Sequence, residues 1–343
     1  MSDSPPREPR SDAQAGDRNA KTFGRRRRGG GGTREELMVP RAEFRSYYGR
    51  PVLKPPVWEW KVPAYLFTGG LSAGAALLAA GADLTGRPAL RRVGRTGSLA
   101  ALLASVYLLV ADLGRPARFH HMLRVAKPTS PMSVGTWILS AYGPGVGVAA
   151  LSEVLPAGLG RTWPGRLLRA SARPAGLASA LFAPAVASYT AVLLSQTAVP
   201  AWHEAHPHLP FVFTGSAAAS SGGFAMALVP VAEAGPARAL AVMGATAELV
   251  ASKVLEKQLG LAAEAYTTGK AHRLRTWSER LTAAGLLGTL VAGRRSRAVA
   301  AAAGAALFAG SALQRFGVFE AGVESTKDPK YVVVPQRERR GRR

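Results

Sequence analysis

The segment at residues 111–137 carries more ionisable side chains than a simple connection between two apolar segments requires. It reads ADLGRPARFHHMLRVAKPTSPMSVGTW, and its ionisable residues are Asp112, Arg115, Arg118, His120, His121, Arg124 and Lys127. Its three prolines prevent an uninterrupted helix. Two interpretations stay open. The segment is a cationic loop bound to lipid headgroups, with Asp112 pairing with Arg115, or it is a docking face and pocket rim where Asp112 exchanges protons.

A second candidate combines Trp58, Glu59 and Trp60 with Tyr65. If a helix begins at about residue 62, Tyr65 lies near the membrane boundary, where its phenol could hydrogen-bond a quinone carbonyl while the aromatic rings stack on the quinone. The spacing by itself favours an aromatic belt at the membrane surface. Both interpretations remain open at this point.

Ionisable residues inside apolar segments are costly, so they are usually paired or functional. Asp83, Glu153 and Glu233 lie near the ends of apolar segments, whereas Glu248 lies deeper. Glu248 is therefore the best candidate for a proton-handling carboxylate. A pair between Glu248 and Lys253 is also conceivable from their spacing.

Metal and haem chemistry is not expected in this chain. The sequence has no cysteine, which excludes thiolate metal sites and cysteine-ligated iron–sulfur clusters. His203, His206 and His208 cluster beside two prolines in an expected loop, and no expected spanning segment contains a histidine. We therefore predict no metal site and no haem.

These candidates are positioned by long apolar runs, each about as long as a helix that crosses a bilayer. The runs are continuously apolar rather than alternating, which favours helices over a β-barrel. The net charge of +23 is concentrated in tails and short loops, so it favours lipid headgroups over nucleic acid. The fold class is therefore all-α integral membrane, with about eight spans predicted at 62–84, 97–113, 134–155, 174–195, 209–232, 237–261, 278–293 and 298–319.

The chain divides into four parts by composition. Residues 1–36 are expected to be a disordered basic tail, residues 37–61 an interfacial or partner-docking segment, residues 62–320 the transmembrane domain, and residues 321–343 a basic C-terminal tail. An even number of spans places both tails on one side, and their cations predict cytoplasmic termini. The short loops disagree, because more of their cations lie on the opposite side.

A weak internal repeat suggests two four-helix halves. Phe67, Thr68 and Gly69 near the start of the first span reappear 146 residues later as Phe213, Thr214 and Gly215 near the start of the fifth.

Three blocks of the sequence carry a resemblance to a known family: YYGRPVLKPPVWEWKVPAYLFTGGLSAG at 47–74, DLGRPARFHHMLRVAKPTSPMSVGTWILSAYGP at 112–144 and FGVFEAGVESTKDPKYVVVPQRER at 316–339. Over residues 37–340 the chain resembles the NrfD/PsrC family of membrane subunits. The resemblance implies two four-helix bundles without a redox cofactor, in the inner membrane. It also implies electron exchange between menaquinone or ubiquinone and a ferredoxin-like iron–sulfur subunit, which connects to a molybdopterin catalytic subunit.

The resemblance also suggests site residues. Aligning on the Trp58–Trp60 element places Val62 and Tyr65 where a relative has an Asn and a His in its quinone pocket, and Val62 cannot hydrogen-bond through its side chain. Asp112, Arg115 and Pro116 match the family's loop motif. The predicted quinone-binding residues are Trp60, Tyr65, Asp112, Arg115 and Tyr142; the proton-handling residues are Asp112 and Glu248; and the docking residues are Arg118, His121, Arg124 and Lys127.

Two rival functions remain open from the sequence. A secondary transporter would use a charged site near the membrane midplane, for which Glu248 is the candidate. A purely structural anchor would only hold soluble partners at the membrane.

Overall fold

The computed structural model describes residues 52–341, which form helices joined by turns and contain no strand. The predicted tail at 1–36 and the first part of the predicted docking segment, residues 37–51, lie outside the described residues. The long helices are α1 (Lys61–Leu84), α2 (Pro88–Ala111), α3 (Pro131–Val154), α4 (Trp163–Ser195), α6 (Leu209–Leu228), α7 (Gly235–Gln258), α9 (Gly269–Ala292) and α10 (Arg297–Lys327). The short ones are η2 (Pro116–Leu123), η3 (Leu159–Arg161), α5 (Pro200–His203), η4 (Gly260–Ala263), α8 (Glu264–Thr267) and α11 (Lys330–Gly341).

Six of the described helices are long and apolar enough to cross a membrane: α1, α2, α3, α4, α6 and α10. The other two long helices, α7 and α9, have 24 residues and five charged side chains each, and they lack a membrane-length stretch that is apolar enough to count as a candidate span. The chain is therefore an all-helical membrane protein with six candidate spans. The predicted total of eight spans stays a prediction.

Proline and short polar side chains define where the helices begin. Proline occupies one of the first two positions of α2, α3, α4, α6 and α7, where its missing N–H costs nothing. Side chains that cap N-termini by accepting a backbone N–H are Ser130 on α3, Thr162 on α4 and Ser296 on α10.

The second and fourth predicted spans begin too late, because α2 starts at Pro88 and α4 at Trp163 rather than at residues 97 and 174. The physical reason in α2 is ion pairing. Arg95 binds Asp83 and Glu153 at 3.0 Å each, and Arg91 binds Glu153 at 2.8 Å, so the charges are compensated inside the helix packing. At the other end of the chain, α10 continues to Lys327 and α11 follows within the predicted C-terminal tail.

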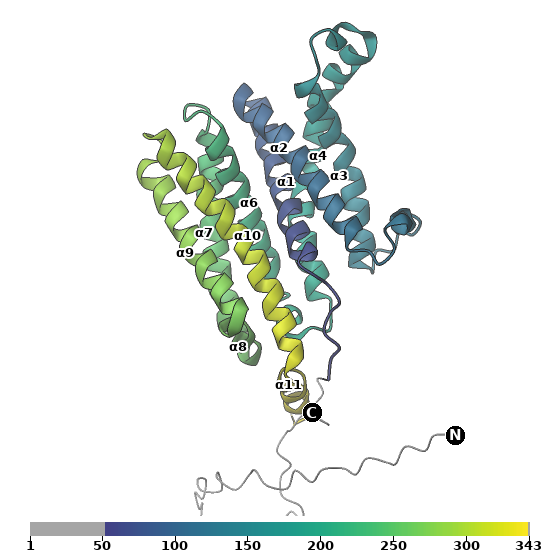
Figure 1. Ribbon diagram of the computed structural model, residues 1–343, viewed down its shortest axis with the longest axis vertical. Helices are drawn as coiled ribbons and strands as arrows, with labels where there is room; N and C mark the ends of the chain where they lie inside the picture. The colour runs from purple at the N-terminus through teal and green to yellow at the C-terminus, as the bar shows by residue number, and fades with distance from the viewer. Residues whose placement is uncertain (1–51, 342–343) are drawn as a thin grey trace, which may run out of the picture. The chain divides into compact units, whose positions relative to one another are not determined.

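The long helices pack in pairs that are consecutive in the sequence: α1 with α2, α3 with α4, α6 with α7, and α9 with α10. Helices α1 and α4 both contact α6, and α10 contacts α6 and α1 (Figure 1). Small residues allow these close approaches. A Cβ added to Gly74 of α1 would lie 2.2 Å from the Ser221 hydroxyl of α6, and one added to Gly223 would lie 2.5 Å from the Gly304 carbonyl of α10.

Candidate functional site

A cavity of about 210 Å³ opens where α1 begins, between the end of α2, the start of α3 and the end of α4. Its lining is mostly apolar or aromatic and includes two tyrosines and one carboxylate. Such a composition is typical of a site for a flat, amphipathic small molecule. The lining residues are Val57, Trp58, Val62, Tyr65, Leu109, Asp112, Leu113, Gly114, Met122, Met132, Gly135, Thr136, Leu139, Tyr189 and Leu193.

Two phenols of this lining, Tyr65 on α1 and Tyr189 on α4, lack a hydrogen-bond partner among the described residues. Tyr65 is buried and lies within electrostatic reach of both Tyr189 and Asp112. A tyrosine hydroxyl both donates and accepts hydrogen bonds, so these two groups can bind a polar molecule that enters the cavity, water included. Gly135 of α3 makes room for Tyr189, because a Cβ at position 135 would lie 2.4 Å from the Tyr189 ring.

Asp112 follows the last residue of α2 and is partly exposed at the rim of the cavity. Burial raises the pKa of its carboxyl group above the usual value, Lys61 lowers that pKa and Glu59 raises it. Asp112 therefore holds a proton more readily than an ordinary aspartate. Its position between cavity and surface allows it to exchange protons with water.

Trp58 is the tryptophan that lines the cavity, and a second tryptophan holds it there. The rings of Trp58 and Trp202 stack at 5.7 Å between centroids with an interplanar angle of 20°. Trp202 is fully buried, donates its Nε1–H to the Val318 carbonyl at 2.8 Å, and lies where a Cβ on Gly322 would clash at 1.9 Å. Trp60, the tryptophan predicted for this role, is 60% exposed and is not part of the lining.

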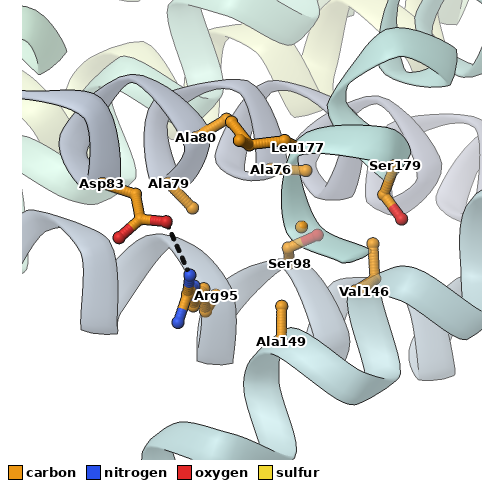
Figure 2. A pocket seen from close by; sticks show the side chains of 11 residues that line it. Ala76, Ala79, Ala80, Asp83, Arg95, Ser98, Val146, Ala149, Leu177 and Ser179 are labelled. Carbon is orange, nitrogen blue, oxygen red and sulfur yellow. Dashed lines mark hydrogen bonds and ion pairs between the residues drawn. The ribbon is translucent and has the colours of Figure 1, made fainter. Parts of the chain in front are cut away.

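Tyr142, a further predicted pocket residue, is fully buried away from the cavity. Its hydroxyl shares hydrogen bonds with Ser72 at 2.8 Å and Ser98 at 3.0 Å. Ser98 also lines a separate cavity of about 20 Å³, enough for about one water molecule. Figure 2 shows this small cavity, with Asp83 and Arg95 towards one side and Ser98 and Ser179 towards the other.

The predicted docking residues Arg118, His121, Arg124 and Lys127 are all exposed, as is Arg115. Arg115 forms no ion pair with Asp112. The loop is ordered by Ser133, whose hydroxyl donates to the Val125 carbonyl at 2.8 Å and accepts the Lys127 N–H at 2.9 Å. The cationic side chains therefore face outward beside the cavity, available to a partner or to headgroups.

Glu248 lies outside this site and is buried in the second group of helices. It accepts a hydrogen bond from Ser311 at 3.3 Å and interacts electrostatically with Arg315. The pair with Lys253 does not form, because Lys253 binds Glu279 at 2.8 Å instead. Arg315 was missed from the sequence, although an arginine inside the apolar segment 298–319 was a signal for it. Tyr189 was missed without any comparable signal.

The fold and the cavity together define an α-helical membrane protein with a mostly apolar cavity at one end of its helices. Residues 52–247, more than half of the chain, match the family described as "Polysulphide reductase, NrfD". The chain belongs to this family, as the resemblance predicted. It is 30% identical over 188 residues to the C subunit of polysulfide reductase from Wolinella succinogenes, a match that covers 50% of this protein and 59% of that relative.

Proposed function

We propose that this chain is the membrane subunit through which an oxidoreductase complex exchanges electrons with menaquinone or ubiquinone. The observation that carries the proposal is the cavity with its two unpaired phenols and its rim carboxylate. Family membership supports the same conclusion, since the relative from Wolinella succinogenes is a subunit of polysulfide reductase. In this proposal, electrons pass to a partner iron–sulfur subunit and from there to a molybdopterin catalytic subunit.

The residues of the cavity fit a quinone by their chemistry. A quinone headgroup is flat and apolar, with a carbonyl oxygen at each end that accepts a hydrogen bond. The side chains of Trp58, Val62 and Leu139 would contact its faces, and the hydroxyl groups of Tyr65 and Tyr189 would donate to its carbonyl oxygens.

Quinol oxidation releases two electrons and two protons, and quinone reduction consumes the same. Asp112 is the group we assign to proton exchange with water, because it lies at the rim and binds protons more readily than an ordinary aspartate. Tyr65 lies within electrostatic reach of both Asp112 and Tyr189. Proton handling by Glu248 stays a separate prediction, since Glu248 does not line this cavity.

We further propose that α7 and α9 cross the membrane, which gives eight spans in two four-helix bundles with cytoplasmic termini in the inner membrane. The charges of α7 and α9 support this proposal because they pair across the two helices. Lys253 binds Glu279, and Arg275 binds Glu256. Paired charges can be accommodated within a helix bundle in a membrane. The exposed cations at 115–127 would face the iron–sulfur partner, next to the cavity.

The test uses the chain purified with its co-purifying partners. In the intact complex, quinol should reduce the iron–sulfur cluster of the partner, and the spectroscopic signal of the cluster reports this reduction. The variants Tyr65→Phe, Tyr189→Phe and Asp112→Asn should each slow it. Tyr107→Phe is the matched control, because Tyr107 of α2 is 72% exposed and lies outside the cavity. If complexes of normal composition showed no reduction of the iron–sulfur cluster by quinol, the chain would be a structural anchor and the proposal would be refuted.

A further inference from the structure

The connections at the end of the helices away from α11 bring three arginines together. These connections join α1 to α2, α6 to α7 and α9 to α10 (Figure 1). Arg87 immediately precedes α2, Arg238 lies in the first turn of α7, and Arg294 follows α9. These three arginines form one cluster, the arginine cradle.

The cradle is centred on Gly235, the first residue of α7. From the point where a Cβ of residue 235 would lie, Arg87 Nη1 is 3.7 Å away and Arg238 Nη2 is 3.8 Å away. Arg238 is within electrostatic reach of both Arg87 and Arg294, and its other terminal nitrogen donates to the Val231 carbonyl at 2.9 Å. Three like charges held this close repel one another unless an anion lies between them.

The described residues supply no such anion. None of the three arginines forms an ion pair within the described part of the protein, and Arg87 Nε is buried without an acceptor. Glu233, in the connection before α7, forms no ion pair with these arginines: its carboxylate accepts the backbone N–H groups of Ala89 at 2.8 Å and Leu90 at 3.3 Å at the start of α2. Asp83 and Glu153 bind Arg91 and Arg95.

The backbone adds donors at the same place. The N–H groups of Gly235 and Ala237 make no hydrogen bond to another described residue, as is usual in the first turn of a helix. The positive end of the α7 dipole therefore lies beside the guanidinium groups of Arg87 and Arg238, and Gly235 places no side chain between them.

Exposed apolar side chains end two of the helices that lead into these connections. Leu84, the last residue of α1, is 61% exposed, and Leu228, the last residue of α6, is 54% exposed. An anion bound at these connections would therefore lie at the same end of the helices as these apolar side chains. A free phosphate ion would not use those side chains, but the acyl chains of a phospholipid would.

We propose that Arg87, Arg238 and the N-terminus of α7 bind the phosphate of an anionic phospholipid, whose acyl chains contact Leu84 and Leu228. Arg294 adds charge at the outer edge of the site. The negative charge of the lipid reduces the repulsion among the three arginines and holds the α1–α2 and α6–α7 connections together. This role is independent of the quinone chemistry proposed for the opposite end.

The test measures how many phosphatidylglycerol molecules stay bound to the full chain with its co-purifying partners, by native mass spectrometry after exchange into detergent. Arg87→Gln/Arg238→Gln should weaken phosphatidylglycerol binding about tenfold or more, the loss expected when two arginines are removed from an anionic lipid. Arg161→Gln/Arg166→Gln is the matched control, because both arginines are exposed, Arg161 at the end of η3 and Arg166 in the first turn of α4. The control should retain the wild-type affinity.

A second, smaller substitution distinguishes loss of lipid binding from loss of the fold. A Cβ in Gly235→Ala would meet both guanidinium groups only at ordinary contact distances, so this variant should fold and yet bind phosphatidylglycerol more weakly. Equal loss in the cradle and control variants would overturn the proposal, as would unchanged binding in Gly235→Ala and in the double variant. Displacement of the lipid by millimolar inorganic phosphate, with no preference for phosphatidylglycerol over phosphatidylcholine, would assign the site to free phosphate instead.

Discussion

The first four long helices and the last four differ at the end where α1 and α6 begin. Beside α1, Tyr65 and Tyr189 line a cavity and find no hydrogen-bond partner among the described residues. In the last four, the short helices α5, η4 and α8 pack against one another and against α7, α9 and α10. There Tyr266 is fully buried and donates to the Ala201 carbonyl at 3.0 Å. A phenol with an internal acceptor stabilises the fold, whereas unpaired phenols around a cavity are available to a ligand.

The repeated motif shows where the two groups are alike. A Cβ on Gly69 of α1 would lie 3.2 Å from the Ser105 hydroxyl of α2, and one on Gly215 of α6 would lie 2.6 Å from the Glu248 nitrogen of α7. Each motif glycine therefore packs against the next long helix. The second group buries a carboxylate at this contact and a guanidinium, Arg315, near it. Both groups pair charges internally, since Arg95 binds Asp83 and Glu153 in the first group. The groups differ at the end where α1 and α6 begin, where only the first group, called the open group, presents unpaired phenols to a cavity; the second is called the closed group.

The largest effect is expected from breaking the buried charges of the closed group. Arg315 donates to the Phe213 carbonyl at 2.6 Å, lies 3.7 Å from the centre of the Phe213 ring and faces Glu248 electrostatically. Arg315→Gln should lower the free energy of unfolding by about 3 kcal/mol or more, because Glu248 is left without its counter-charge. Thermal denaturation in detergent measures this. The double variant Glu248→Gln/Arg315→Gln should lose less, and a single variant as stable as the wild type would contradict a structural role.

The next effect contrasts two tyrosines. Tyr65→Phe should slow quinol-dependent electron transfer about 100-fold with little change in stability, because it removes a donor and proton-transfer group from the cavity. Tyr266→Phe should leave the electron-transfer rate unchanged and lower the free energy of unfolding by about 1 kcal/mol, the typical value of one hydrogen bond. Stopped-flow reduction and thermal denaturation separate the two outcomes. If Tyr65→Phe and Tyr266→Phe slowed electron transfer from quinol equally, the open and closed groups would not differ in their contribution to this reaction.

A smaller effect is expected from the glycine that accommodates Tyr189. Gly135→Ala forces the Tyr189 ring to move, which should raise the KM for quinol roughly tenfold, in line with the 1–3 kcal/mol typical of overpacking. Gly147→Ala is the control on the same helix, because no atom lies within 4 Å of its added Cβ. Steady-state kinetics at varied quinol concentration tests both. An unchanged KM in Gly135→Ala would show that Tyr189 does not contact the substrate.

The smallest change concerns the pH dependence at the cavity rim. If Asp112 accepts protons from quinol, the rate should rise with pH through its pKa, which burial moves above the usual aspartate value. Lys61 lowers that pKa and Glu59 raises it, so Lys61→Gln should move the rise to higher pH and Glu59→Gln to lower pH. Lys61 and Glu59 also pair at 3.2 Å, and removing either one frees the other to act in the same direction.

The pH profile of the electron-transfer rate measures these shifts. Asp112→Asn should abolish the rising limb. Shifts in the same direction for both Lys61→Gln and Glu59→Gln would show that another group controls the proton step.

Much of the site was predictable and part of it was not. Tyr65 and Asp112 were predicted, because a tyrosine at the start of an apolar helix and a carboxylate at the end of the next one lie at the same boundary. Trp60 and Tyr142 were predicted to line the pocket, but the cavity is lined by Trp58 and Tyr189. Trp58 and Trp60 both precede α1, and Tyr142 and Tyr189 lie on different helices, so which of them faces the cavity depends on the tertiary packing.

The sequence by itself determined the class of this protein. Long continuous apolar runs require helices in a lipid environment, since each backbone N–H and C=O group must be paired internally. Prolines and short polar residues then set many helix starts.

Only the tertiary structure decided which polar groups are paired. It placed Arg95 between Asp83 and Glu153 and Lys253 against Glu279, and it left Tyr65 and Tyr189 without partners among the described residues. These contacts join residues that are distant in the sequence, and their energies depend on distance and burial, which no spacing in the sequence specifies.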